Sequence, residues 1–153
     1  MEKIEFSRLN LVSPLYYTAD EMSDPFGYRE GDGEKIVCFE LGEARAAAFE
    51  PDRADFLGDA VFMGRAADAG GTAAGGTAAR GEDRRSLWEL PRGAYLFAQK
   101  RELLSREDIV GMAAEMQQEG LWQRLRLGRR IYLRWLFEDG RSVTQLFRPF
   151  AQP

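Results

Sequence analysis

The stretch that decides the fold is RIYLRWLFEDGRSVTQLFRPF, Arg130–Phe150. Apolar residues recur along both of its arms, and the dipeptide between them, Asp139-Gly140, is a typical two-residue hairpin turn. A turn at this position places Tyr132 opposite Phe147 and sets the register of every other pair. The stretch therefore predicts an antiparallel β-hairpin.

The two faces of this hairpin differ in polarity, because side chains alternate between faces along a strand. The more apolar face, which we expect to pack against a helix, carries Ile131, Leu133, Trp135, Phe137, Thr144 and Leu146. The other face mixes aromatic and aliphatic side chains with one arginine and one glutamine: Tyr132, Arg134, Leu136, Val143, Gln145 and Phe147. This second face cannot be buried unless Arg134 is paired, and full exposure would leave apolar area in water.

A helix is predicted upstream of the hairpin, from about Arg106 to Glu119. Ser105 and Asp108 approximate a capping box, with Asp in place of the usual Glu or Gln. Gly120 is placed to end the helix. The apolar residues at helical spacing are Ile109, Met112, Ala113 and Met116.

Other segments with strand-like composition are Lys3–Val12, Lys35–Leu41, Asp59–Arg65 and Ala94–Ala98. Residues 13–34 are rich in Pro and Gly, which predicts a loop with at most one helical turn. Residues 43–50 fit either the second arm of a hairpin or a helix. The sequence thus predicts an α+β fold with a mainly antiparallel sheet and one principal helix.

With 153 residues, the chain is expected to form a single domain over residues 1–153. A Gly/Thr/Ala-rich segment at 66–86 contains the pentapeptide Gly-Gly-Thr-Ala-Ala twice, from Gly70 to Ala79. Its small side chains offer little surface to bury, so we expect a flexible loop within the domain.

Histidine is absent, and Cys38 is the only cysteine. These counts exclude imidazole metal sites, thiolate clusters and the Ser-His and Cys-His nucleophilic pairs. Three acids, Glu40, Glu89 and Glu138, are available, but nothing places two of them together. We therefore predict no catalytic residue, no metal and no cofactor, and interpret Cys38 as a small buried side chain.

Charge is distributed unevenly along the chain. Residues 1–79 carry 7 basic and 15 acidic side chains, and residues 80–153 carry 14 basic and 10 acidic ones. Because the net charge is −4, we expect no nucleic-acid partner despite the arginine-rich second half. The sequence shows neither an apolar run long enough to span a bilayer nor a secretory signal, so a cytoplasmic protein without a membrane partner is expected.

Short motifs in the second half resemble gyrase-inhibitor-like (GyrI-like) effector-binding domains over about residues 59–150. The motifs are LPRGAYLF, a helix ending in EG, then IYLRW and VTQLFRPF. The resemblance implies a pseudo-twofold pair of β-α-β-β repeats with a ligand cleft between them. It also implies binding of small molecules, either in transcription regulators or in stand-alone binders, and in some members hydrolysis.

Two departures from the family pattern matter. The first half lacks a clear long helix, so the repeat pair would be degenerate. The last strand carries Thr144-Gln145 where the family pattern has Thr-Glu, which weakens the expectation of cation binding and of hydrolysis. With Arg134 nearby and no acid, we expect neutral-polar or anionic ligands.

The leading hypothesis is a stand-alone small-molecule (effector) binding domain with an aromatic-lined cleft and a regulatory role. The candidate ligand-binding residues, with Leu96 as an alternative to the first, are Tyr95, Tyr132, Arg134, Gln145 and Phe147, flanked by Trp88 and Trp122. The alternative is a protein-interaction or inhibitor module that binds a protein partner through the arginine-rich hairpin or the acidic N-terminal half.

Overall fold

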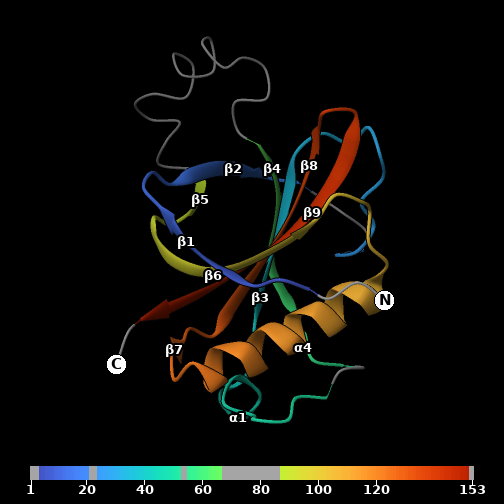
Figure 1. Cartoon of the computed structure of the whole chain (residues 1–153). Helices are drawn as coiled ribbons and strands as arrows, with labels where there is room; N and C mark the ends of the chain where they lie inside the picture. Colours follow the sequence, from blue (N-terminus) through green and yellow to red (C-terminus); the bar gives the residue numbers. More distant parts are fainter. Residues whose placement is uncertain (1–3, 21–23, 53–54, 67–86, 152–153) are drawn as a thin grey trace.

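The computed structural model describes residues 4–20, 24–52, 55–66 and 87–151 (Figure 1). The predicted loop at 66–86 lies outside them except for Ala66. The described helices are α1 (Glu43–Ala46) and the long α4 (Arg106–Trp122). The strands are β1 (Ser7–Leu11), β2 (Leu15–Ala19), β3 (Lys35–Glu40), β4 (Ala60–Ala66), β5 (Trp88–Leu90), β6 (Gly93–Lys100), β7 (Arg126–Leu127), β8 (Arg130–Glu138) and β9 (Arg141–Ala151).

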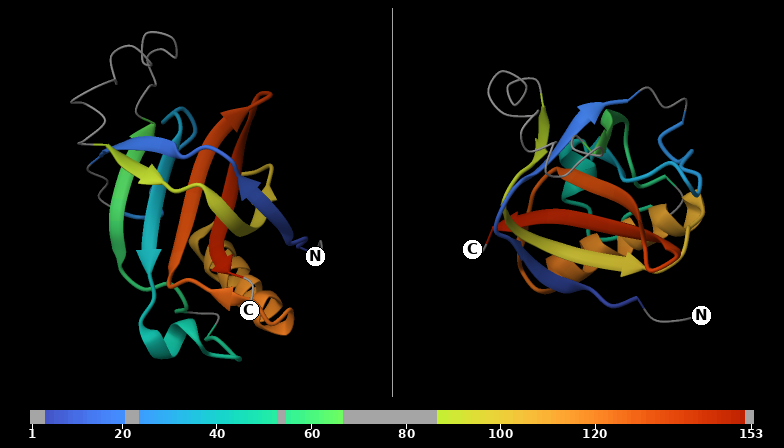
Figure 2. Two further views of the ribbon diagram at one scale, coloured as in Figure 1. Left: turned by 90° about the vertical axis from the view of Figure 1, so that its left-hand side faces the viewer. Right: turned by 90° about the horizontal axis from the view of Figure 1, so that it is seen from above.

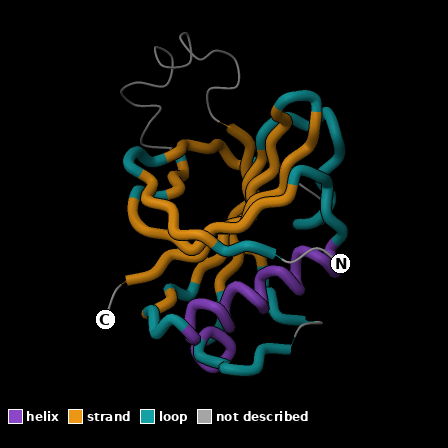
Figure 3. The backbone as a smooth tube through the Cα atoms, viewed as in Figure 1, coloured by secondary structure: helices purple, strands orange, loops and turns teal. Residues whose placement is uncertain are grey.

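The fold is α+β, with a mainly antiparallel sheet and one main helix. The sheet order is β1-β6-β9-β8-β3-β4-β2-β5, with β7 paired to β9. Only residues 12–14 connect β1 to β2, and only residues 91–92 connect β5 to β6. Since each of these links joins strands from opposite ends of the order, the sheet has to curl into a half-barrel (Figures 2 and 3). The curl gives it an inner face and an outer face.

The central hairpin forms as predicted. Asp139 and Gly140 have φ angles of 52° and 77°, as a two-residue turn with two left-handed residues requires. Tyr132 pairs with Phe147, and Arg134 pairs with Gln145. The predicted register is therefore confirmed.

Helix α4 covers the outer face of the sheet, and its apolar side chains form one core with the predicted hairpin face. The Oγ of Ser105 accepts a hydrogen bond from the backbone N–H of Asp108 at 3.2 Å, which confirms the cap. The buried residues that meet between helix and hairpin include Ile109, Met112, Ala113, Met116, Ile131, Leu133, Trp135 and Leu146.

Gly120 does not end the helix as predicted, because α4 continues to Trp122. A Cβ atom at Gly120 would lie 2.7 Å from a methyl carbon of Leu127 and 2.9 Å from one of Leu96. The glycine thus permits close approach of the helix to the sheet. From the sequence alone, a glycine needed for close packing cannot be distinguished from one that ends a helix.

The prediction of a loop at residues 13–34 is wrong for Leu15–Ala19, which form β2. This strand is too short to show clear alternation, and it is held by β4 on one side and β5 on the other. Of the two alternatives for residues 43–50, a hairpin arm or a helix, the structure has a helix, the short α1. The first strand is also shorter than predicted, starting at Ser7.

Candidate functional site

Aromatic rings fill the inner face of the sheet. This inner aromatic cluster consists of Tyr17, Phe62, Trp88, Tyr95, Phe97, Tyr132 and Phe147. The ring centroid of Tyr95 lies 6.1 Å from that of Tyr132 and 5.7 Å from that of Phe147. The centroids of Trp88 and Tyr132 are 5.7 Å apart. The alternation of side chains along β6, β8 and β9 brings these rings to one face, opposite the face that α4 covers.

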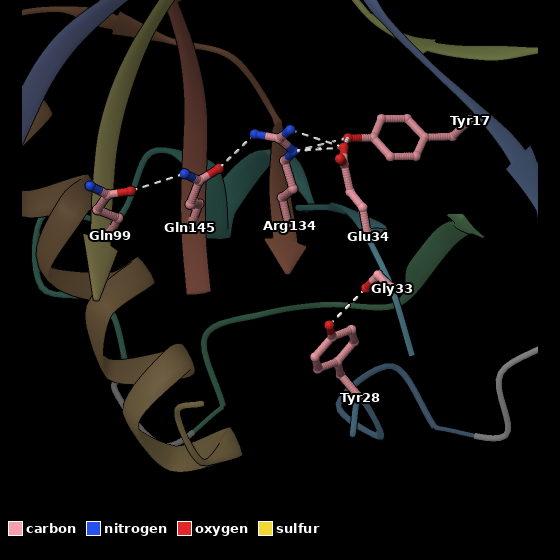
Figure 4. Close-up of polar contacts among 7 residues, drawn as sticks. All are labelled: Tyr17, Tyr28, Gly33, Glu34, Gln99, Arg134 and Gln145. Carbon is pink, nitrogen blue, oxygen red and sulfur yellow. Dashed lines mark hydrogen bonds and ion pairs between the residues drawn. The ribbon is translucent and has the colours of Figure 1, made fainter. Parts of the chain in front are cut away.

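A polar row runs along one end of the same inner face (Figure 4). It contains Gln99 from β6, Gln145 from β9, Arg134 from β8, Glu34 just before β3 and Tyr17 from β2. The amide nitrogen of Gln145 donates to Gln99 Oε1 at 2.9 Å, and Arg134 Nη1 donates to Gln145 Oε1 at 2.9 Å.

The row continues from Arg134 to a carboxylate and a phenol. Arg134 Nη2 lies 2.9 Å from Glu34 Oε2, and its Nε donates to both Glu34 Oε2 and the Tyr17 hydroxyl oxygen at 3.0 Å. The Tyr17 hydroxyl donates to Glu34 Oε2 at 2.6 Å. The row is thus a continuous chain of hydrogen bonds that links four strands of the sheet and the residue before β3.

Arg134 remains charged inside this row. Burial alone would lower its pKa, but Tyr17 and Glu34 together raise it above the usual value. The expectation that a ligand would meet Arg134 without a compensating carboxylate is therefore wrong, because Glu34 supplies one. Sequence reasoning missed Glu34 since it lies at the end of a Gly-rich segment read as loop. The sequence did contain one signal: Glu34 lies two residues before the strand residue Ile36, and residues two apart in an extended chain point to the same face.

The structure brings together six of the seven predicted site residues. Tyr95, Tyr132 and Phe147 are buried in the cluster, Trp88 is half-buried against it, and Arg134 and Gln145 lie in the polar row. Trp122 does not join them, because it ends α4 with 77% of its surface exposed. Leu96, the alternative to Tyr95, lies in the core under α4 on the opposite face.

Two further polar groups of the inner face are the hydroxyl of Tyr95 and the thiol of Cys38. The hydroxyl of Tyr95 donates to the carbonyl oxygen of Pro91, which anchors the turn before β6. Burial raises the pKa of the Cys38 thiol to about 12. This agrees with the interpretation of Cys38 as an inert core side chain.

A cavity of about 490 Å³ opens beside β1 and β6. It is lined by Glu5, Ser7, Phe97, Ala98, Gln99, Lys100 and Arg101. Phe97 belongs to the inner aromatic cluster and Gln99 to the polar row, so the cavity adjoins both.

Within the described part of the chain, no group of His, Cys, Asp and Glu side chains is arranged to hold a metal ion. The helices described there are too short or too polar to cross a membrane. Fold and site define a half-barrel of antiparallel strands with one covering helix and an aromatic inner face. Neither family models nor curated protein sequences give a match to this chain.

Proposed function

We propose that this chain is a small-molecule-binding domain whose ligand contacts the inner aromatic cluster and the polar row. The observation that carries the proposal is the position of the row on the inner face, directly beside an aromatic cluster whose rings of Phe62, Trp88 and Phe97 are only partly buried. Small-molecule sites typically combine apolar and aromatic walls with a few fixed polar groups.

Stability alone is a weak reason to keep an ion pair in this place. Removing two charges from water costs free energy that their attraction only partly returns, so apolar side chains of similar size often stabilise as well. Arg134 and Glu34 have side chains only 17% and 29% exposed. A recognition role would give a reason for this pair to lie beside Gln145 and Gln99 on the inner face.

The row also suggests the ligand's character. Because Glu34 balances Arg134, the row presents donors and acceptors without net charge. We therefore propose that the part of the ligand beside the row is neutral and polar, while its apolar part lies against the rings.

We further propose that the chain is a degenerate pair of β-α-β-β repeats of the GyrI-like type. The order β6-β9-β8 in one half is matched by β2-β4-β3 in the other, and β8 pairs with β3 between the halves. Helix α4 follows β6, whereas no helix is described between β2 and β3. This arrangement supports a twofold relation of strands, with the ligand face between the two halves.

The test is binding with matched variants. A thermal-shift screen of neutral, anionic and cationic compounds would be combined with native mass spectrometry of the purified protein. We expect a bound compound whose affinity falls at least about tenfold in Arg134→Gln and Phe147→Leu. Trp122→Phe is the control and should bind like the parent chain, because Trp122 lies away from the inner face. Equal binding by all three folded variants would contradict the proposal.

The alternative of a protein-interaction module acting through the arginine-rich hairpin gains no support from these contacts. Of the hairpin arginines, Arg134 is engaged in the polar row and Arg148 is fully buried. Arg130 is paired with Glu40 at 3.2 Å. The hairpin therefore presents no continuous row of exposed arginines.

A further inference from the structure

We infer that the cavity beside β1 and β6 binds an uncharged aromatic ligand through a hydrogen-bond acceptor, a ring nitrogen or a carbonyl oxygen, that meets the side-chain NH₂ group of Gln99. The inference rests on the proposed function, and it names the position and the chemical class of that function's ligand. A volume of about 490 Å³ is within the usual range for pockets that enclose small ligands.

The direction of the hydrogen bonds along the polar row is fixed at Arg134. A guanidinium can only donate, so Gln145, which Arg134 Nη1 contacts at 2.9 Å, has to present its carbonyl oxygen. The NH₂ group of Gln145 then faces Gln99 and donates to its Oε1 at 2.9 Å. The oxygen of Gln99 is thus used inside the row, and its NH₂ group lies at the outer end (Figure 4).

That end of the row lies at the cavity, because Gln99 is an exposed residue of its lining. From Arg134 through Gln145 to Gln99, each donor points the same way along the row. Hydrogen bonds in such a chain polarise one another, which strengthens the last donor. The ligand group that continues the chain is therefore an acceptor.

The charged side chains around the cavity favour an uncharged acceptor over an anion. Arg101 lies 3.8 Å from Glu138 and 3.8 Å from Asp139. Lys100 already has a partner. Glu5 adds a carboxylate to the lining, which would repel an anion. A cation, in turn, would face the donor end of the row. An uncharged acceptor avoids both conflicts.

Phe97 provides an aromatic wall beside Gln99. β1 pairs with β6 only as far as Ser7, which lies opposite Phe97, so this pairing does not reach Gln99. Residues two apart in a strand point to the same face, which puts the ring and the amide side by side. The ring of Phe97 is half-buried and lies 5.0 Å from that of Phe147, between centroids. A flat ligand at Phe97 would extend the inner aromatic cluster and bring its acceptor to Gln99.

The experiment compares two fused-ring probes of similar size and opposite hydrogen-bonding character. Quinoline has an acceptor and no donor, whereas indole has an N–H donor and no strong acceptor. Both are titrated into the full chain at mildly alkaline pH, where neither carries a charge, and binding is followed by NMR. We expect the parent chain to bind quinoline about tenfold more tightly than indole. Phe97→Leu should weaken both probes.

Gln145→Glu tests the direction of the row at a residue outside the cavity lining. A carboxylate can only accept, so it would take hydrogen bonds from Arg134 and from the NH₂ group of Gln99. The amide of Gln99 would then turn its oxygen to the cavity, and indole should bind more tightly than quinoline. Gln99→Glu places an acceptor at the cavity directly and should invert the preference as well. Gln118→Glu makes the same change at an exposed position of α4 and is the matched control, which should keep the preference for quinoline.

The remaining outcomes separate this inference from the proposed function. Equal affinity for the two probes in the parent chain, or binding of neither, would overturn the inference. A preference that inverts in Gln99→Glu but not in folded Gln145→Glu would overturn the role of the row, and inversion in Gln118→Glu would overturn both steps. In each of these cases the screen with Arg134→Gln and Phe147→Leu judges the proposed function by itself.

Discussion

Two arginines of the same hairpin, Arg134 half-buried and Arg148 buried, differ in pKa, and only Arg134 has a carboxylate beside it. Arg134 pairs with Glu34, and its pKa is raised. Arg148 donates to the carbonyl oxygen of Gly128 and to Gln117 Oε1, and burial lowers its pKa to about 10. Burial acts to lower the pKa of both guanidinium groups, and Tyr17 and Glu34 reverse that shift at Arg134, whereas Arg148, which faces α4, has no carboxylate to do so.

The Arg134–Glu34 pair leads to the first prediction. Glu34→Gln should lower the free energy of unfolding by about 1–3 kcal/mol, because it leaves an enclosed guanidinium without its counter-charge. Urea unfolding measures the loss. The control is Glu40→Gln, which breaks the exposed Arg130–Glu40 pair, with side chains 48% and 43% exposed, and should cost under about 1 kcal/mol. Equal losses in the two variants would contradict the role of Glu34.

The second prediction concerns Cys38. Since burial raises the pKa of its thiol to about 12, almost no thiolate forms at mildly alkaline pH, and the thiol is covered by the inner cluster. A chromogenic thiol reagent should therefore label the native protein only as fast as it unfolds, and label the urea-unfolded chain at once. Rapid labelling without denaturant would show that the inner face opens.

At the scale of elements, β4 depends on a glycine within its length. A Cβ atom at Gly64 would lie 2.5 Å from a ring carbon of Phe62 and 2.7 Å from the carbonyl oxygen of Thr18. The backbone of β2 and the ring of Phe62 thus leave no room for a side chain at Gly64. The stack between Phe62 and Trp88 has a centroid distance of 4.5 Å.

The third prediction follows from this crowding. Gly64→Ala should destabilise the protein by about 1–3 kcal/mol, because the methyl group displaces Phe62 or the neighbouring strand. The measurement is urea unfolding followed by tryptophan fluorescence. Gly42→Ala is the control, since a Cβ atom there meets nothing within 4 Å, and it should cost under about 1 kcal/mol. A larger loss at Gly42 than at Gly64 would refute the steric argument.

Elements with strong local signals could be predicted from the sequence, and elements defined by distant partners could not. The hairpin turn at Asp139-Gly140 and the cap at Ser105 are local, and both formed as expected. β2 and Glu34 are defined by pairing with strands far away in the sequence. The inner face was therefore half predictable: its hairpin residues were found, and their partner carboxylate was not.

For the molecule as a whole, the tyrosines show how thoroughly the structure excludes water. Burial, as the main cause, raises the pKa values of Tyr17, Tyr28, Tyr95 and Tyr132 above the ordinary value of 10.0. Three of these four phenols line the inner face. Their protonation is therefore coupled to folding.

The fourth prediction is the resulting pH dependence. Above pH 10 the unfolded chain loses phenolic protons that the folded chain keeps, so the unfolded state binds fewer protons and stability falls as pH rises. Their contribution is fully present below pH 10 and is lost progressively above it. Urea midpoints at increasing pH and the ultraviolet absorbance of tyrosinate measure both effects. The prediction would be contradicted if the tyrosinate absorbance of the native protein rose over the same pH range as that of the unfolded chain.

The two short links that curl the sheet also constrain the order in which the chain can fold. β1 is synthesised before its partner β6, and β6 pairs in turn with β9, which follows later still in the chain. Pairings between such distant segments close long loops, which slows folding. During synthesis β1 therefore has no partner in this sheet until β6 has followed it out of the ribosome.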